Sequence, residues 1–245
     1  MSLEISSEII RNKVFSFTDF DGKYWAFGTI LNGLYITDFN GKIIQHINKN
    51  KGLPNNTILS LHYQKNGKIW MGLDYGLSYS DIKNNITYFY NTNSDFGTGY
   101  AAALQDNTFY LGTNQGLYSA PWDALDNRKD INPFSIIKGA EGQVWTLQKV
   151  GNKILFGHDA GLFVIDNHQL KKIDSEPGVM SILLYDENTL LTGNYNGISI
   201  FKKENNSWKF VKKMKIILGA INQIVKEDHQ ILWVNIPNYG FIRFK

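Results

Sequence analysis

Catalysis needs ionisable side chains that converge on one point, and the histidines are the first candidates. The five histidines are His46, His62, His158, His168 and His229. None of them forms a metal-ligand spacing such as H-x-x-x-H. The chain contains no cysteine, which excludes disulfides and thiolate metal sites. We therefore predict no metal site and no cofactor.

Glycine-bracketed turns are the second place where chemistry could lie. The stretches "GTNQG" and "GHDAG" lack the Lys-Ser/Thr continuation and the helix that a phosphate-binding loop needs, so we exclude that function. Asp74 and Asp159 occupy two turns of this kind, and a glycosidase or lyase could use such a carboxylate pair. The sequence does not place the two carboxylates within reach of one another. We predict no catalytic residue and no enzymatic activity.

These turns belong to a repeat that runs through the chain. The stretch "IWMGLDYGLSYSD" aligns with "WAFGTILNGLYITD", "FYLGTNQGLYSA", "ILFGHDAGLFVID", "LLTGNYNGISIF" and "LWVNIPNYGFIRF". The second glycines of the six copies are Gly33, Gly76, Gly116, Gly161, Gly197 and Gly240, at spacings of 43, 40, 45, 36 and 43 residues. In the sixth copy Asn235 replaces the first glycine. Six copies at this period indicate repeated architecture and not a ligand loop.

The repeat predicts the fold. Short apolar stretches separated by Asn-Gly and similar turns are typical of antiparallel hairpins. Four such strands in about 40 residues predict an all-β, six-bladed β-propeller of four-stranded antiparallel blades, with a linear β-solenoid as the alternative. The single propeller would span residues 1–245, with blades at 13–50, 51–92, 93–138, 139–174, 175–214 and 215–245. We expect the first glycine of each copy where adjacent repeats come close.

Two segments depart from the repeat. The sixth copy lacks a fourth strand, so we expect residues 3–10 to supply the outermost strand of the last blade and to close the ring, which would remove exposed strand edges. The third copy contains a longer, polar connection from Ala120 to Phe134, in which "PWDAL" is expected to form a helical turn on the surface.

Composition narrows the class of protein. The 245 residues, 43% hydrophobic, suffice for one large all-β domain with a substantial core. The net charge of +3 is spread thinly, and pairs such as Lys212-Lys213 are short, so we predict a solvated surface and no nucleic-acid patch. No apolar run approaches the roughly 18 residues of a membrane span, and no signal peptide is visible. Because "MSLE" is typical of an expression remnant, we expect a piece of a longer protein.

The segment "NKGLPNNTILSLHYQKNGKIWMGLDYGLSYSD" resembles the two-component-regulator propeller repeat, in which "GL-x-NN-x-V/I-L-x-L" leads through "G-x-I/L-W-x-G" to "GL". The segments "AEGQVWTLQ", "FGHDAGLFVID" and "GNYNGISIF" are similar to the sensor regions of Bacteroidetes regulators. The resemblance covers nearly the whole chain and is weakest in the sixth copy.

The resemblance implies a function and a location. In that family the blades lie outside the cytoplasm, and a β-sandwich, a membrane span and a histidine-kinase or helix-turn-helix output follow. It implies a periplasmic sensing segment whose partners are the downstream β-sandwich and output domains. An oligosaccharide ligand is implied by the same resemblance. We expect homodimers as one mode of signalling, and no direct contact of this segment with nucleic acid or membrane.

In a propeller, the turns between second and third strands share one face with the loops that link successive blades. We call this the loop face; it is the usual binding surface. The candidate ligand-binding residues there are Asp74, Tyr75, Tyr100, Asn114, Gln115, His158, Asp159, Tyr195, Asn196, Asn238 and Tyr239. Tyrosines and amides offer stacking surfaces and neutral hydrogen bonds that suit sugars or peptides.

Each of these residue types can also be explained by a purely structural role. Asn and Asp are good turn formers, and His158 fits a turn histidine with hydrogen-bond partners. Trp70, Trp145 and Trp233 fit the core between blades better than a sugar platform. We predict a non-enzymatic sensor that binds a small ligand or a protein on the loop face. The alternatives are a carbohydrate-active propeller enzyme and a purely structural interaction platform.

Overall fold

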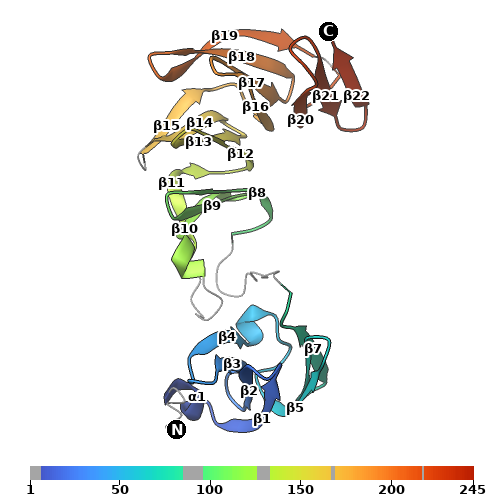
Figure 1. Ribbon diagram of the computed structural model, residues 1–245. Helices are drawn as coiled ribbons and strands as arrows, with labels where there is room; N and C mark the ends of the chain where they lie inside the picture. Colours follow the sequence, from blue (N-terminus) through green and yellow to red (C-terminus); the bar gives the residue numbers. More distant parts are fainter. Residues whose placement is uncertain (1–6, 85–95, 126–132, 167–168, 217) are drawn as a thin grey trace. The chain divides into compact units, whose positions relative to one another are not determined.

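The computed structural model describes residues 7–84, 96–125, 133–166, 169–216 and 218–245 (Figure 1). The chain is all-β, with six antiparallel sheets of three or four strands. It divides into two compact units, the N-terminal unit (1–95 with 124–132) and the C-terminal unit (96–123 with 133–245). Among the described residues, no helix is long and apolar enough to cross a membrane.

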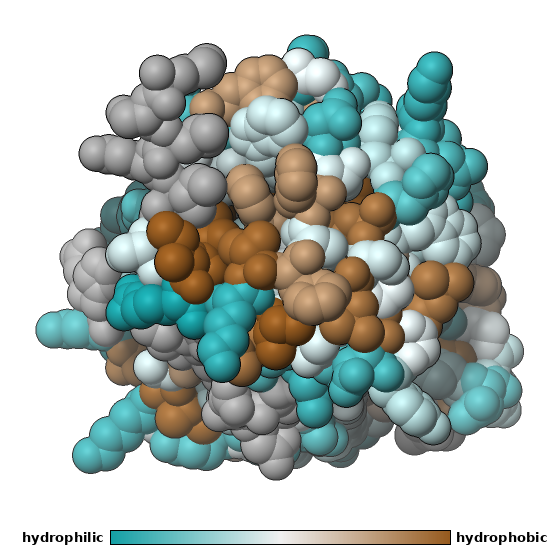
Figure 2. Space-filling model, turned by 90° about the horizontal axis from the view of Figure 1, so that it is seen from below, coloured by the Kyte–Doolittle hydropathy of each residue, from teal (hydrophilic) through white to brown (hydrophobic). Residues whose placement is uncertain are grey.

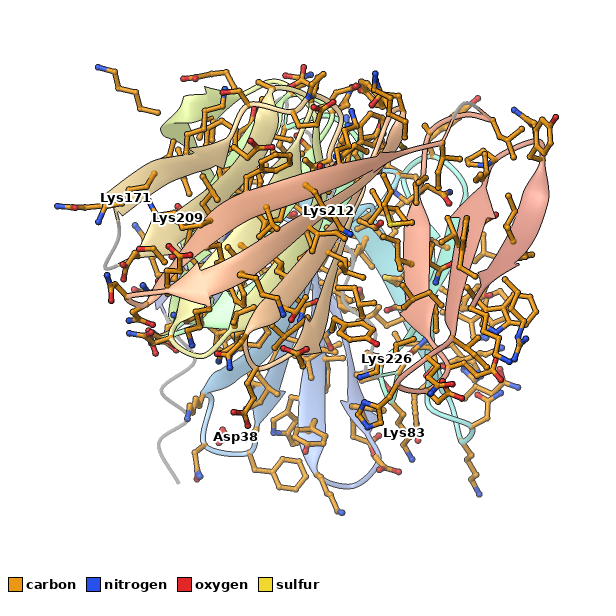
Figure 3. All side chains as sticks on the ribbon, turned by 90° about the horizontal axis from the view of Figure 1, so that it is seen from above. Asp38, Lys83, Lys171, Lys209, Lys212 and Lys226 are labelled. Carbon is orange, nitrogen blue, oxygen red and sulfur yellow. The ribbon has the colours of Figure 1, made fainter. Side chains whose placement is uncertain are left out.

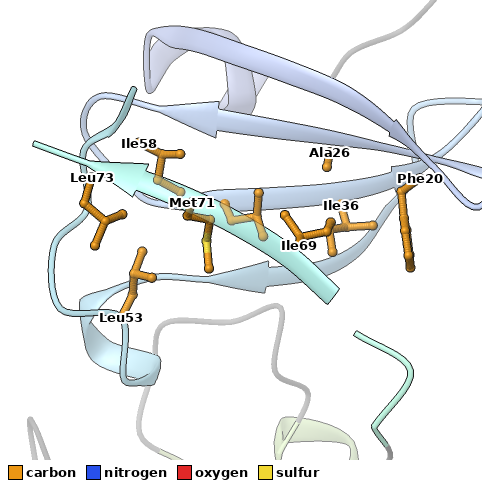
Figure 4. Close-up of a cluster of buried hydrophobic side chains, with 9 residues drawn as sticks. Phe20, Ala26, Ile36, Leu53, Ile58, Ile69, Met71 and Leu73 are labelled. Carbon is orange, nitrogen blue, oxygen red and sulfur yellow. The ribbon is translucent and has the colours of Figure 1, made fainter. Parts of the chain in front are cut away.

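The N-terminal unit contains one short helix and two sheets, with strand orders β1-β2-β3-β4 and β5-β6-β7. Its elements are α1 (Ser7–Arg11), β1 (Val14–Phe20), β2 (Tyr24–Thr29), β3 (Leu34–Asp38), β4 (Ile43–Ile47), the 3₁₀ turn η1 (Lys49–Lys51), β5 (Ile58–Gln64), β6 (Lys68–Leu73) and β7 (Leu77–Asp81). The expected fourth strand of the second sheet, "ITYFY" at 86–90, lies outside the described residues. The side chains between the two sheets form one apolar core, which includes Phe20, Ile36, Ile58, Ile69 and Met71 (Figure 4).

The C-terminal unit contains four sheets, with strand orders β8-β9-β10-β11, β12-β13-β14-β15, β16-β17-β18-β19 and β20-β21-β22. The first eight strands are β8 (Gly99–Gln105), β9 (Thr108–Thr113), β10 (Gly116–Pro121), β11 (Ser135–Glu141), β12 (Val144–Val150), β13 (Lys153–His158), β14 (Gly161–Asp166) and β15 (Gln169–Asp174). The others are β16 (Ser181–Asp186), β17 (Thr189–Asn194), β18 (Gly197–Glu204), β19 (Ser207–Lys215), β20 (Gln223–Lys226), β21 (Leu232–Ile236) and β22 (Gly240–Phe244). The helical turn expected in "PWDAL" is confirmed as η2 (Trp122–Leu125).

The predicted hairpins are confirmed, and all six sheets are antiparallel and connected in sequence order. The predicted number of blades and their closure into one ring stay predictions. The second glycines mostly have the expected left-handed backbone, as at Gly33 with φ +77°. Gly116 is an exception, since its φ is not positive. A larger residue is excluded there by lack of space, because an added Cβ would lie 2.8 Å from the side chain of Ile136.

The first glycines lie where the sequence placed them, at the contact between successive sheets. In the N-terminal unit, a Cβ on Gly28 would lie 2.7 Å from the side chain of Ile58 on the next sheet. In the C-terminal unit, a Cβ on Gly112 would lie 2.7 Å from Val144, and one on Gly157 would overlap the carbonyl oxygen of Val179. Because any Cβ would push two backbones apart, this position needs glycine for packing and not for φ.

One predicted element is wrong. The expected closing strand at residues 3–10 is a helix over Ser7–Arg11, and residues 3–6 lie outside the described part. Ile9 is completely buried and packs with Phe27 and Tyr35 of the first sheet. Glu8 lies in the first turn and Arg11 in the last, the arrangement that the helix dipole favours. The apolar Ile9 therefore anchors a helix on the first sheet instead of a strand on the last.

Apolar side chains also gather on the surface of the N-terminal unit, on the side from which Figure 2 is viewed. Phe15, Phe17 and Phe39 are 61%, 66% and 41% exposed. The ring of Trp25 lies 6.3 Å from Phe17 and 5.3 Å from Phe39, between centroids, so Phe17, Trp25 and Phe39 are contiguous. Contiguous apolar surface of this kind marks a face that another element or partner covers.

Candidate functional site

Within each unit, the turns between second and third strands are hydrogen-bonded to the loops that enter the next sheet. The Gly142 N–H donates to the Gln115 carbonyl over 2.9 Å, and the Gly178 N–H donates to the Asp159 carbonyl over 2.9 Å. In the N-terminal unit, the Gly33 N–H, at the turn between β2 and β3, donates to the Asn56 carbonyl in the loop into β5 over 2.8 Å. These turns and loops therefore lie side by side, as the loop face requires.

Asn114 is used by the fold. Its Oδ1 accepts a hydrogen bond from the Thr98 N–H over 2.7 Å, and its own N–H donates to the Thr98 carbonyl over 3.1 Å. The amide side chain therefore holds the loop that leads into β8. The neighbouring Gln115 side chain is exposed at the surface.

His158 is buried, with 3% of its surface exposed. Its Nε2 lies 2.9 Å from the Glu141 carbonyl, and its Nδ1 accepts from the Ala160 N–H over 2.9 Å. A neutral ring with the proton on Nε2 satisfies both partners. The Asp159 Oδ1 also lies 2.5 Å from Nδ1, a contact between two acceptors unless one of them carries a proton. The structural reading of His158 as a turn histidine with partners thus fits its geometry.

Tyr100 and Trp145 form the exposed aromatic feature of the loop face in the C-terminal unit. Their rings are stacked, with centroids 5.1 Å apart and planes at 15°. Tyr100 is 43% exposed, while Trp145 is partly buried beneath it. The Trp145 Nε1 is buried and has no hydrogen-bond partner among the described residues. A stacked pair with one open face is a surface on which a sugar or peptide ring can pack.

A β-bulge projects each of these two rings. The pairing of β8 with β9 skips from Gly99 to Ala101, and that of β12 with β13 skips from Val144 to Thr146, so Tyr100 and Trp145 are the extra residues. A bulge turns its extra side chain out of the regular alternation of the strand. The sequence predicts Tyr100 in a linking loop and Trp145 in the core between blades, whereas both lie at bulges in first strands.

A sequence signal for these bulges exists. In the N-terminal unit the register also shifts around Phe15 and Leu59, which are 61% and 40% exposed. Four of the six first strands begin with a large residue followed by a small one, in "VFS", "ILS", "GYA" and "VWT". That pattern, repeated at the same place in the first four copies, is a signal for the projecting residues.

A second polar cluster of the loop face surrounds Tyr195. The Tyr195 ring, 40% exposed, covers Gly178, where an added Cβ would overlap the ring. The Asn196 Oδ1 accepts a hydrogen bond from Lys213, and Lys213 is ion-paired with Glu176. This cluster offers an aromatic edge, an amide and an ion pair within one turn of the C-terminal unit.

The remaining candidates have few internal contacts. Tyr239 is 66% exposed and follows Asn238, whose φ is +66°. In the N-terminal unit, Tyr75 is 87% exposed and Asp74 is exposed beside it. Across the described ranges, no three His, Cys, Asp or Glu side chains are grouped so that they could hold a metal ion.

A surface hollow of the N-terminal unit lies at the opposite ends of its strands and not at the loop face. Its lining includes Asp21, Lys23, Tyr24 and Lys83. The Asp21 carboxylate is engaged by Lys83 over 3.3 Å and by the Tyr63 hydroxyl over 3.2 Å. The hydrogen bond from Lys83 is the main cause that lowers the pKa of Asp21 below its usual range. Two of the charges that line the hollow, Asp21 and Lys83, are thus partners of one another.

Comparison of the sequence with known protein families gave no matching family model, and no curated protein matches the chain. Comparison of the fold gave many solved structures. One is described as the extracellular domain of the one component system BT4673 from B. thetaiotaomicron, at a TM-score of 0.51 and 17% identity; it covers 95% of this chain and 36% of that chain. A second structure of this domain, described as that of a hybrid two component system, has a TM-score of 0.49 at 17% identity and covers 95% of this chain and 36% of that chain.

PorZ, a bacterial surface component of the type-IX secretion system of Porphyromonas gingivalis, is similar at a TM-score of 0.49 and 12% identity, covering 94% of this chain and 38% of that chain. The chain thus spans less than two fifths of each of these structures. At 17% identity the likeness to BT4673 shows a shared fold. That shared fold confirms, at the level of the fold, the resemblance of the repeat to the extracellular regions of such regulators.

Proposed function

We propose that this chain is a non-enzymatic, extracytoplasmic sensing segment of a signalling regulator and that its ligand binds on the loop face. The stacked pair of Tyr100 and Trp145 is the observation that carries the proposal. The shared fold with an extracellular domain of a Bacteroides regulator supports the location and the class of protein. The ligand class we favour is an oligosaccharide, with a peptide or protein partner as the second possibility.

The physical argument concerns the open face of the Tyr100 ring. Tyr100 leaves 43% of its surface in water although it sits on a rigid strand, so little conformational entropy is lost when a ligand covers it. The apolar C–H face of a sugar can stack on the phenol ring, and exposed amides such as Gln115 can bond its hydroxyl groups. The same chemistry suits a peptide with an aromatic side chain.

Signalling would start at the strands that carry the two rings. Tyr100 is on β8 and Trp145 on β12, the first strands of two adjacent sheets. A ligand that draws Tyr100 away from Trp145 changes the packing between these sheets. Downstream β-sandwich and output domains, or a homodimer, would read that change, because a ligand shifts an equilibrium only by its differential affinity for the two states.

The test is a thermal-shift screen of the chain against neutral oligosaccharides and peptides. A ligand at about 100 times its Kd adds about 2.7 kcal/mol to stability, which raises Tm by about 5–10 °C in a protein of this size. Tyr100→Ala should abolish the shift. Tyr79→Ala is the matched control, since Tyr79 is also an exposed tyrosine beside a tryptophan, Trp70, but lies on β7 and not on the loop face.

Three outcomes would overturn the proposal. An equal loss of the shift in Tyr79→Ala and Tyr100→Ala would remove the loop face as the binding surface. Release of shorter products from an oligosaccharide, lost in Asp159→Asn, would favour the carbohydrate-active enzyme instead. A complete screen without any shift, together with capture of a protein partner that Tyr100→Ala still binds, would favour the structural platform.

A further inference from the structure

Strands β18 and β19 concentrate positive charge. The span Gly197–Lys215 contains six lysines, which are Lys202, Lys203, Lys209, Lys212, Lys213 and Lys215, and Glu204 is its one acidic residue. The whole chain has a net charge of only +3. Figure 3 labels Lys209 and Lys212 on β19, the outer strand of its sheet. The positive charge is therefore concentrated on one pair of strands, although the net charge of the whole chain is low.

Three of these lysines share one face of the sheet. Lys202 on β18 is paired directly with Lys209 on β19, and Ile200 is paired with Lys212. Cross-strand partners lie on the same face, and Ile200 and Lys202 are two residues apart, so they also share a face. We call Lys202, Lys209 and Lys212 the basic face. All three are exposed.

The charges of the basic face are only partly compensated. The Lys202 ammonium donates to the Thr189 hydroxyl over 2.6 Å, and Thr189 donates in turn to Asp186 over 2.8 Å. Lys209 and Lys212 have no ion pair with any residue in the described ranges. Like charges directly opposite one another on a sheet are destabilising. An anion bound here would relieve that repulsion.

Protection of an exposed sheet edge is the usual reason for lysines on an outer strand. It does not explain their distribution here, because β4 is also an outer strand of its sheet and has no lysine, while β11 has one, Lys138. An apolar side chain lies on the same face: Met214 is paired with Ile198, two residues before Ile200, and is 40% exposed. The surface therefore combines a row of cations with accessible apolar area.

We propose that the basic face binds an acidic polysaccharide. Positions along and across strands are separated by about 3.3 Å per residue and about 5 Å per strand, so the ammonium groups form a row that fits regularly spaced anions on a linear polymer. Each unit of an acidic polysaccharide carries a carboxylate or sulfate and an apolar C–H surface, which matches lysines beside the exposed Met214. A nucleic-acid duplex presents phosphates outside and keeps its apolar bases stacked inside, so it would leave that side chain uncovered. This surface is separate from the loop face and does not depend on the proposed sensor ligand.

The test measures binding of the chain to polygalacturonate and dextran sulfate at low salt, with neutral dextran as the uncharged polymer. We expect binding to the two acidic polymers that weakens as salt rises, because counterions are released. Lys209→Gln with Lys212→Gln should weaken it at least about tenfold, since each lysine near an anionic surface contributes separately. The matched control is Lys42→Gln with Lys65→Gln, which removes the same charge from two exposed positions of the N-terminal unit.

Any other binding result overturns the inference. An equal loss in the control pair would mean that net charge and not the basic face drives binding. Tighter binding to a DNA duplex than to either acidic polymer, or binding to phosphatidylglycerol vesicles without binding to the polymers, would assign the face to another partner. No binding to either acidic polymer at low salt would exclude the basic face as a site for acidic polysaccharides. Equal melting temperatures of the variants and the parent protein would show that the substitutions leave the fold intact.

Discussion

Gly157→Ala is the sharpest test of the contact between successive sheets. Gly157 lies in β13 with an ordinary strand backbone, so alanine brings no φ penalty. Its Cβ would overlap the Val179 carbonyl oxygen and would lie 2.8 Å from both the Thr146 Cγ2 and the Val179 Cγ1. Neither backbone can yield without moving a sheet. The adjoining hydrogen bond from the Val179 N–H to the His158 carbonyl, 3.1 Å long, would also be lost.

The expected cost can be summed from these two effects. Overpacking a rigid interior costs about 1–3 kcal/mol, and a lost backbone hydrogen bond costs about 1 kcal/mol, so we expect a loss of about 2–4 kcal/mol. Urea denaturation followed by tryptophan fluorescence measures it as a lower midpoint at unchanged slope. Gly99→Ala is the matched control: its backbone φ is also ordinary, and the nearest atom to its Cβ is a flexible Leu111 methyl at 3.3 Å. That variant should change stability by less than about 1 kcal/mol.

The chain has two compact units, and if they unfold in two separate transitions, each variant can be assigned to its own unit. Gly157→Ala should lower the transition of the C-terminal unit. Gly28→Ala, whose Cβ would lie 2.7 Å from Ile58, should lower that of the N-terminal unit. If Gly157→Ala were as stable as Gly99→Ala, the close approach between β13 and the loop into β16 would be refuted, and the first glycine would need another explanation.

Three further predictions follow from buried or paired side chains. Ile9→Ala should cost about 2–4 kcal/mol in the N-terminal unit, measured by urea denaturation, because Ile9 is fully buried; no loss would mean that α1 does not dock. His158→Phe should cost about 2–3 kcal/mol in the same assay, because it leaves the Glu141 carbonyl and the Ala160 N–H without their ring partner; an unchanged midpoint would contradict the hydrogen-bonded ring. Lys213→Gln should cost less than about 1 kcal/mol, since its ion pair with Glu176 is partly exposed, and a larger loss would show a stronger role for that cluster.

The repeat allowed the sheets to be predicted because its glycines and turn residues recur with a fixed period. The segment at 3–10 was predicted wrongly for a physical reason: a short apolar run such as "SEII" has no length over which helical and strand periods can be told apart. Only the pocket formed by Phe27 and Tyr35 decides that Ile9 enters as part of a helix. The prediction of a strand rested on the missing fourth strand of the last sheet, whereas the structure of this segment is determined by a tertiary contact that the sequence does not show.

The candidate site was predictable in its position but not in its detail. The hydrogen bonds of Gln115 and Asp159 to the linking loops follow from propeller topology, which the repeat predicts. The stacking of Tyr100 on Trp145 depends on two bulges, and bulges change register without a strong change in composition. The pairing of Lys202 with Lys209 depends on the register of one hairpin, so the two charges look unrelated along the chain.

The first glycine and the bulge belong to one arrangement. In β12 the residue after the bulge, Thr146, is small and faces Gly157 of the same sheet, where an added Cβ would lie 2.8 Å from its methyl group. Since that space is filled, the preceding large side chain cannot point toward the glycine and is turned outward. In β1 the corresponding Ser16 lies against Gly28, and Phe15 is turned outward.

The packing requirement therefore fixes where a side chain projects and leaves its identity free. In the C-terminal unit the two projecting residues are Tyr100 and Trp145, and they stack on one another across adjacent sheets. A ligand that binds the Tyr100 ring acts on a strand whose neighbour, β12, touches Gly112 through Val144. Under the proposed function, binding at the loop face and packing between these sheets would be coupled through Tyr100, Trp145 and Val144. A Tyr100→Ala variant that loses ligand binding but keeps its melting temperature would separate the ring's role in binding from the role of the glycine in packing.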